Sequence, residues 1–99
     1  MAYPEHFAKH LRLTILRLLS AAPSFRANSS IIRDTADELG VPATRDQVRG
    51  EIAWLVEQGL ATSTEPQAGL VVATITERGL DIASGAAAHP GVQRPAPRG

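Results

Sequence analysis

Two arginines separated by about one helical turn, Arg45 and Arg49, are the residues of this sequence best suited to bind an anionic partner. Side chains at positions i and i+4 of a helix project side by side, so both guanidinium groups could grip the major groove of DNA. Gln47 lies between them and could read adenine through a bidentate amide contact. Gly50 and Ala53 leave room for a duplex to approach closely. We therefore predict a DNA-binding helix here.

These three side chains also have purely structural alternatives. The side chain of Gln47 could instead accept the capping hydrogen bond of its own helix. Arg49 could pair with Asp46 or Glu57, and Arg45 could simply be solvated. The geometry of the helix decides between the two interpretations.

The helix that carries these residues has a clear start and a clear end. Thr44 and Gln47 stand three residues apart in a capping box, where each side chain accepts a hydrogen bond from the other residue's backbone N–H. Gly59 is a typical terminating residue. Between these limits the apolar residues follow the helical period. They are Val48, Ile52, Leu55 and Val56.

Two further helices are predicted before this one. An amphipathic first helix ends near Ser20, and a second helix, capped by Asn28 or Ser29, ends at Gly40. The apolar stripes of these helices should face the core. Their members are Phe7, Ala8, Leu11, Ile15, Leu18 and Leu19 in the first helix, and Ile32, Thr35, Ala36 and Leu39 in the second.

After the third helix the pattern becomes extended. Strands are predicted at 60–65 and 70–76, joined by a turn at 66–69, and together they form a hairpin. Thr76 can cap a fourth helix. Gly79 lies inside that helix and weakens it by about 1 kcal/mol relative to alanine.

This order of elements predicts a mainly α fold with a small β-hairpin, the winged helix-turn-helix. It would have a three-helix core, a two-stranded wing and a C-terminal helix, with a tight turn at Val41-Pro42-Ala43 between the second and third helices. We assign residues 1–88 to this domain. The Pro/Gly-rich tail 89–99 is expected to be extended or disordered.

Three segments of the chain resemble a known group of proteins. These segments are TRDQVR at 44–49, AWLVEQGL at 53–60 and VVATITERGLD at 71–81. They look like the small winged-helix proteins of Mu-like phages and prophages, a group named by architecture rather than by a demonstrated activity. More distantly, the chain resembles bacterial regulators of the arsenic-repressor and multidrug-repressor type. The cysteine metal ligands of the arsenic-repressor type are absent, so metal sensing does not carry over.

The charge distribution weighs against DNA as a partner. The chain has ten basic and ten acidic residues, whereas dedicated nucleic-acid-binding domains are usually basic. Five basic residues stand against one acidic residue before position 34, but the span 34–81 has three against nine. The turn of the predicted wing contains no Lys or Arg. Phosphate contacts would come from Arg26 and Arg33, or from Arg94 and Arg98 in the tail.

Composition also disfavours several classes of function. No cysteine is present, which removes disulfides, thiolate catalysis and Cys-ligated zinc. No glycine-rich phosphate loop or nucleophile arrangement is recognisable, so we expect neither an enzyme nor a cofactor. His6 and His10 have a spacing that can share a metal, but no third ligand matches them, and no metal site is predicted. Arg12 and Arg17 interrupt the first apolar run, which indicates no membrane span and a cytoplasmic protein.

Surplus apolar residues suggest a homodimer formed through the first and fourth helices. Leu13 and Leu16 lie outside the apolar stripe of the first helix, and Trp54 lies beside that of the third, as a core residue or a dimer contact. The leading functional prediction is a phage or prophage protein that binds double-stranded DNA, as a transcriptional regulator or a DNA-recognising accessory factor. The alternative is a protein-interaction module, acting with another phage or host protein in assembly or packaging without DNA.

Overall fold

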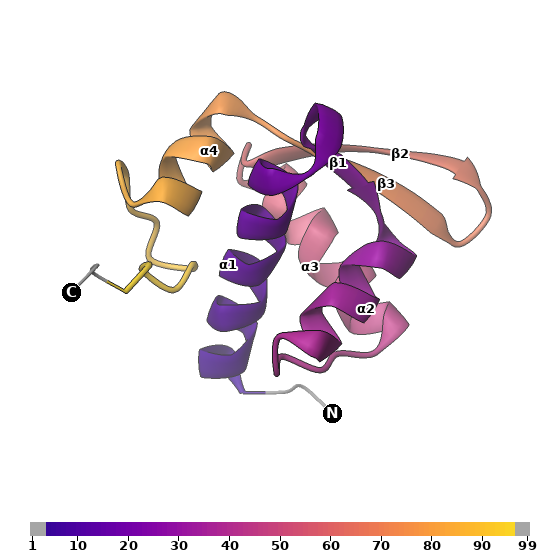
Figure 1. The fold of residues 1–99 in the computed structure, drawn as a ribbon, viewed down its shortest axis with the longest axis horizontal. Helices are drawn as coiled ribbons and strands as arrows, with labels where there is room; N and C mark the ends of the chain where they lie inside the picture. The colour runs from indigo at the N-terminus through magenta and orange to yellow at the C-terminus, as the bar shows by residue number, and fades with distance from the viewer. Residues whose placement is uncertain (1–3, 97–99) are drawn as a thin grey trace.

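The first helix, α1, runs through the middle of the molecule in the computed structural model, which describes residues 4–96. Figure 1 shows α4 and the C-terminal segment on one side of α1, and α2 and α3 on the other. Arg98, a predicted phosphate contact, lies outside the described residues. The elements in chain order are α1 (Glu5–Ala21), the 3-10 helix η1 (Pro23–Phe25), β1 (Arg26–Asn28), α2 (Ser29–Glu38), α3 (Arg45–Glu57), β2 (Ala61–Gln67), β3 (Leu70–Ile75) and α4 (Glu77–Ser84).

The central position of α1 buries more of its surface than the single predicted apolar stripe. Leu13 is 6% exposed and Leu16 is 0% exposed, so both are core residues. The prediction that these two leucines contact a second chain is therefore wrong. A helix at the edge of a fold buries one stripe, whereas α1 packs against α4 as well as against α2, α3 and β3. The homodimer stays a prediction, but Leu13 and Leu16 do not support it.

The predicted helix caps are confirmed. Asn28 Oδ1 accepts a hydrogen bond from Ile31 N–H at 2.9 Å and so caps α2. At α3, Thr44 Oγ1 accepts from Gln47 N–H at 3.1 Å, and Gln47 Oε1 accepts from Thr44 N–H at 2.8 Å. These bonds satisfy backbone donors that the first turn of a helix leaves without partners. The start of each helix is thereby fixed.

Two residues predicted to face the core do not do so. Leu39 is 64% exposed, because it lies at the C-cap of α2, beyond the last regular turn. Val56 is 36% exposed near the end of α3. The core itself is formed by the other apolar positions of these helices. They are Ile32 and Ala36 in α2, and Val48, Ile52 and Leu55 in α3.

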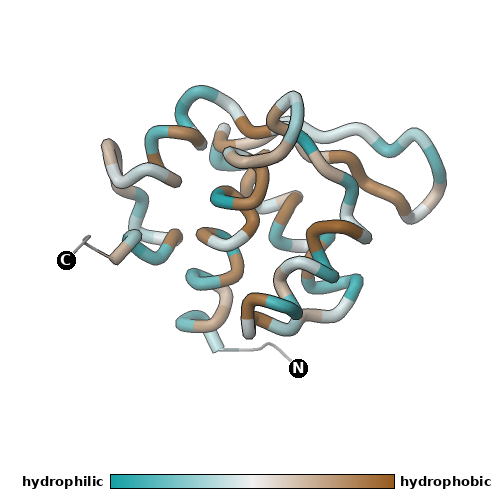
Figure 2. The backbone as a smooth tube through the Cα atoms, in the orientation of Figure 1, coloured by the Kyte–Doolittle hydropathy of each residue, from teal (hydrophilic) through white to brown (hydrophobic). Residues whose placement is uncertain are grey.

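The predicted hairpin belongs to a three-stranded antiparallel sheet with the strand order β1-β3-β2. The third strand, β1, was not predicted, because three residues are too short to show an alternating pattern. It pairs with β3, so that Asn28 lies opposite Val72. In Figure 2, β3 is hydrophobic over much of its length, whereas β2 is pale to hydrophilic. This difference fits their positions, since β3 is central and β2 lies at an edge.

The hairpin turn is shorter than predicted. β2 continues through Pro66 to Gln67, and the ladder has an irregular register between Thr64 and Gln67. Gly69 completes the turn with φ +82°, a value that L side chains rarely adopt. The hairpin of β2 and β3 projects well beyond the helices and forms the wing (Figure 1).

Gly79 in α4 is required for packing. A Cβ atom at this position would lie 2.2 Å from the carbonyl oxygen of Leu60 and 2.7 Å from Cγ1 of Ile75. We expect Gly79→Ala to lower the free energy of unfolding by about 1–3 kcal/mol, because the overpacked site must shift backbone atoms.

The matched control is Gly50→Ala in α3, where a Cβ atom would meet nothing within 4 Å. This change should raise the free energy of unfolding by about 0.5–1 kcal/mol, the usual gain of alanine over glycine inside a helix. Urea unfolding of both variants checks the pair. Equal effects of the two changes would contradict the packing explanation.

The C-terminal segment packs against the domain, in contrast to the extended or disordered tail that was predicted. Val92 is 4% exposed, and the N–H of Gln93 donates a hydrogen bond to Lys9 O at 3.1 Å. As the composition indicates, no helix or strand forms at 89–96, the part of the tail that the structure describes. It does not exclude docking through backbone groups and one buried side chain.

Candidate nucleic-acid interface

Arg45 and Arg49 open onto one cleft of about 330 Å³ where α2, α3 and the wing meet. Arg45 is exposed, and the side chain of Arg49 is 37% exposed. Both guanidinium groups are therefore accessible to a partner. We call this site the arginine cleft, and it is lined by Ser29, Ser30, Arg45, Arg49, Gln67, Ala68, Gly69 and Leu70.

Local interactions explain why these three elements meet. The capping box fixes the first turn of α3, which carries Arg45. Ser29 Oγ accepts a hydrogen bond from Val71 N–H at 3.1 Å and thereby ties the start of α2 to strand β3. The N-terminus of α2 also brings the positive end of its dipole to the cleft, which favours an anion there. The walls of the cleft are thus held by hydrogen bonds from backbone N–H groups to side-chain oxygens.

Arg49 lies between an acidic neighbour and the tip of the wing. Its Nη2 donates to the carboxylate of Asp46, one turn earlier on α3, so this predicted alternative is confirmed and pairing with Glu57 is not observed. A Cβ atom on Gly69 would lie 3.6 Å from Arg49 Nη1. The wing has no basic residue at its tip, but α3 places a guanidinium group beside it.

Gln47 is not available for the role predicted for it. Its Oε1 atom accepts the Thr44 N–H within the capping box, and the residue is half-buried. A bidentate contact to adenine needs both the oxygen and the nitrogen of the amide. The prediction of Gln47 as a reader of adenine is therefore wrong, and its function is to hold α3 in place.

The other predicted phosphate contacts lie outside the arginine cleft. Arg26 lines a separate hollow, with Ile31 and Pro66 among its neighbours. Arg33 is exposed on α2, one turn after Ser30, and does not line the cleft. Arg94 lines a third hollow, beside the C-terminal segment. Of the five arginines that were predicted to contact DNA and lie within residues 4–96, only Arg45 and Arg49 line the cleft.

Sequence reasoning missed the serines and the wing tip as parts of the site. Ser29 and Ser30 reach the cleft because β1 pairs with β3, which brings the start of α2 to the wing. That pairing has no local sequence signal. Only the topology of the predicted fold could have indicated that the start of the second helix lies beside the wing.

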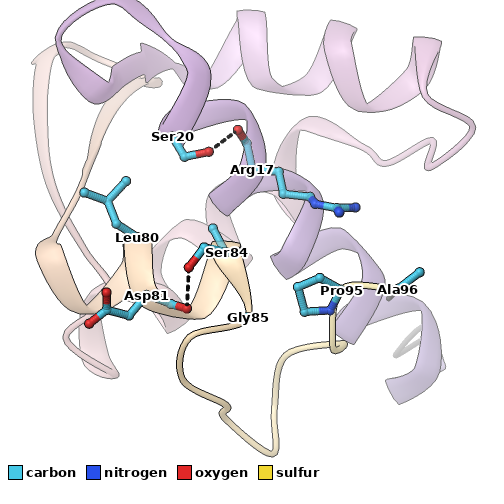
Figure 3. Close-up of a pocket in the computed structure, with 9 residues that line it drawn as sticks. Arg17, Ser20, Leu80, Asp81, Ser84, Gly85, Pro95 and Ala96 are labelled. Carbon is cyan, nitrogen blue, oxygen red and sulfur yellow. Dashed lines mark hydrogen bonds between the residues drawn. The ribbon is translucent and has the colours of Figure 1, made fainter. Parts of the chain in front are cut away.

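A larger hollow of about 880 Å³ lies between α1, α4 and the C-terminal segment. Figure 3 shows its serine hydroxyls turned toward the backbone of their own helices. Ser20 donates to Arg17 O at 2.7 Å, and Ser84 donates to Asp81 O at 3.1 Å. Its polar groups therefore do not converge on a ligand, and we do not assign it a function.

A buried cation, Arg12, forms the centre of a second polar cluster. Its Nε donates to Glu51 Oε1 at 2.7 Å, and its Nη1 donates to Gly91 O at 2.9 Å. The guanidinium carbon lies 4.0 Å from the ring centroid of Trp54, a cation–π contact. Burial raises the pKa of the Glu51 carboxyl. Trp54, predicted as a core or dimer contact, is half-buried against its own chain.

Neither a metal centre nor a membrane span is found in the part of the chain that the structure describes. Over residues 4–96, no three His, Cys, Asp or Glu side chains are placed to hold a metal ion. The rings of His6 and His10 contact each other edge to face, with centroids 4.7 Å apart. Of the four helices, none has the length and apolar character needed to cross a bilayer.

The order of elements and the projecting hairpin define a winged-helix protein. The solved structure of RosR from H. salinarum has this fold, with a TM-score of 0.63 and 17% sequence identity. The match covers 75% of this chain and 66% of the RosR chain, just under two thirds. That likeness concerns the fold alone.

The sequence relatives show the family. The chain belongs to the family of gp26 of Escherichia phage Mu, an uncharacterised protein with which it shares 48% identity over 87 residues, 88% of each chain. An uncharacterised protein of Haemophilus influenzae is 44% identical over 80 residues, covering 81% of this chain and 78% of that protein. No family model matches the sequence. The resemblance to Mu-like phage proteins is thereby confirmed.

Proposed function

We propose that this protein binds double-stranded DNA through the arginine cleft. The observation that carries the proposal is the convergence of Arg45 and Arg49 on one accessible cleft between α2, α3 and the wing. The winged-helix fold supports it, because an α-helix such as α3 fits the major groove and the start of α2 can meet a phosphate.

The two arginines would have different roles. Within the described chain, Arg45 is in no ion pair and can contact a base edge or a phosphate directly. Arg49 must exchange its partner Asp46 for a DNA acceptor, and its position beside Gly69 would place that contact close to the wing. Guanidinium groups suit such acceptors because they donate in a fork geometry.

The family relationship with a Mu protein supports a role in phage biology. We propose that the protein acts as a transcriptional regulator or as a DNA-recognising accessory factor, as a homodimer and without catalysis or a cofactor. The zero net charge favours a partner that is recognised by a local site rather than by a broad basic surface.

The experiment is a fluorescence anisotropy titration of labelled duplex DNA at several salt concentrations. Each phosphate neutralised by the protein contributes about −0.9 to the slope of log K against log salt. A linear fall of log K with increasing log salt concentration supports the proposal. The absence of binding even at low salt would contradict it.

Removing the acidic partner of Arg49 is expected to strengthen DNA binding. Asp46→Asn breaks an exposed ion pair, worth about 0.2–1 kcal/mol, and removes the negative charge that is paired with Arg49. The affinity should rise several-fold in the same titration. Asp81→Asn in α4 is the matched control, because it changes the net charge equally but lies at the other hollow. An equal gain from both variants would show an effect of net charge only.

A second candidate function, a protein-interaction module, is favoured by one observation. Ile31 is 52% exposed and lines a hollow with Pro23, Pro66 and Val72. Such apolar exposure is typical of contact surfaces. If DNA binding fails, Ile31→Lys is the variant to compare with the wild type in capture of phage or host partners.

A further inference from the structure

Residues 89–93 form a segment that lies across α1 and α3, and we call it the strap. Gly91 O accepts a hydrogen bond from Arg12 Nη1 at 2.9 Å, and the N–H of Gln93 donates to Lys9 O at 3.1 Å. Val92 is 4% exposed between them. The strap is therefore bound by a few specific contacts and has no helix or strand to hold it.

Glycine is required at the centre of the strap. A Cβ atom on Gly91 would lie 2.5 Å from Cζ2 of Trp54. The backbone of the strap thus lies directly on the indole ring. Any movement of the strap changes the surroundings of that ring.

One side chain of the strap, His89, joins it to α3 and to its own backbone. His89 Nδ1 accepts a hydrogen bond from Gly91 N–H at 2.9 Å. Because Nδ1 is an acceptor, the ring is neutral and its proton is on Nε2, which donates to Gln58 Oε1 at 3.0 Å. The ring also contacts Trp54 edge to face, with centroids 5.2 Å apart. Docking therefore depends on the neutral form of His89.

The groups around His89 disfavour a positive charge on its ring. Burial lowers the pKa of His89, and the cations Arg78 of α4 and Arg12 of α1 lower it further. Lys9 of α1 and Arg94 line the same hollow as the ring. From α3 the ring meets the uncharged Gln58 and Trp54. The carboxylates of this cluster are Glu51 of α3 and Glu5 of α1, and both are bonded to Arg12.

We propose that the strap is a pH-sensitive cover over Trp54 and Arg12, released when His89 is protonated. A proton on Nδ1 removes the acceptor of the Gly91 N–H and places a third cation beside Arg12 and Arg78. Release uncovers the indole ring and frees an Arg12 donor on one face of α1 and α3. This inference concerns the opposite side of α1 from α2 and is independent of DNA binding.

The direction of the pH dependence follows from the lowered pKa. The undocked histidine titrates near its ordinary pKa of about 6.5, whereas the docked histidine titrates below it. Docking is therefore complete above about pH 6.5 and is lost as the pH falls through the lowered pKa.

The test uses the fluorescence of Trp54, the single tryptophan of the chain. Titration of the full chain from about pH 8 to pH 5 should give a reversible red shift with a midpoint below about pH 6.5, while the helical circular dichroism is retained. Gly91→Val should show the red-shifted emission at every pH, because its side chain cannot fit against the indole. An unchanged emission of the wild type over this range would overturn the proposal.

The assignment to His89 is tested by two matched variants. His89→Gln cannot titrate and should lack the acid transition, whether its strap is docked or free at pH 8. His6→Gln combined with His10→Gln removes the other two histidines and should keep the transition. Persistence of the transition in His89→Gln would overturn the proposal, as would an NMR titration giving His89 a pKa at or above about 6.5.

Discussion

Replacing Arg45 and Arg49 together with alanine is expected to weaken binding to duplex DNA by about 2–4 kcal/mol, or roughly 30- to 1,000-fold. The two side chains are the cations of the arginine cleft, and no other Lys or Arg within residues 4–96 lines it. Each good bidentate contact of an arginine to a base contributes about 1–3 kcal/mol. If both contact phosphates, the salt slope should also fall by about two.

The control for this prediction is a second double variant, Arg26→Ala with Arg33→Ala. It also removes two positive charges, but Arg26 lines a different hollow and Arg33 lies outside the cleft. Its affinity should stay much closer to that of the wild type. Equal losses of affinity in the two double variants would show that binding depends only on the net charge of the protein. That result would contradict DNA binding by the arginine cleft.

Glu51→Ala is expected to lower the free energy of unfolding by about 3–5 kcal/mol. The side chains of Arg12 and Glu51 are 9% and 8% exposed, so the change leaves a guanidinium group without its buried counter-ion. Gly91 O and the exposed Glu5 still accept hydrogen bonds from Arg12, but neither replaces the carboxylate. Urea unfolding with circular dichroism measures the loss.

A double variant separates the ion pair from the packing. Burial raises the pKa of Glu51 even with Arg12 beside it, so desolvation of this carboxyl opposes its charged form. Arg12→Met with Glu51→Leu removes both charges and should recover most of the stability lost by Glu51→Ala, because buried pairs are often replaced by apolar residues at little cost. A double variant less stable than Glu51→Ala would contradict this interpretation.

The features predicted from the sequence are those encoded by neighbouring residues. The capping box of Thr44 and Gln47 positions α3, and the spacing of Arg45 and Arg49 places them on one side of that helix. The extended pattern after Gly59 likewise predicts the wing. Each of these signals acts within a few residues, so no knowledge of the tertiary structure was needed.

The features that were missed depend on contacts between distant parts of the chain. Leu16 is buried because α4 covers a second side of α1, and no local pattern shows that. The strap docks because Arg12 reaches Gly91, 79 residues along the chain. For Gln47 the sequence allowed two roles, reading adenine or capping its helix. The hydrogen bond from Thr44 N–H to Gln47 Oε1 shows that it caps the helix.

The most direct test of the proposed DNA interface is an NMR titration of the isotope-labelled protein with duplex DNA. The proposal predicts that the largest shift changes fall on the backbone amides of Ser29, Ser30, Arg45 and Arg49 and on the wing tip at 67–70. The strap should change little, as should the hollow lined by Arg26 and Val72. No change at all, or changes centred around Ile31 and Val72, would contradict DNA binding by the arginine cleft.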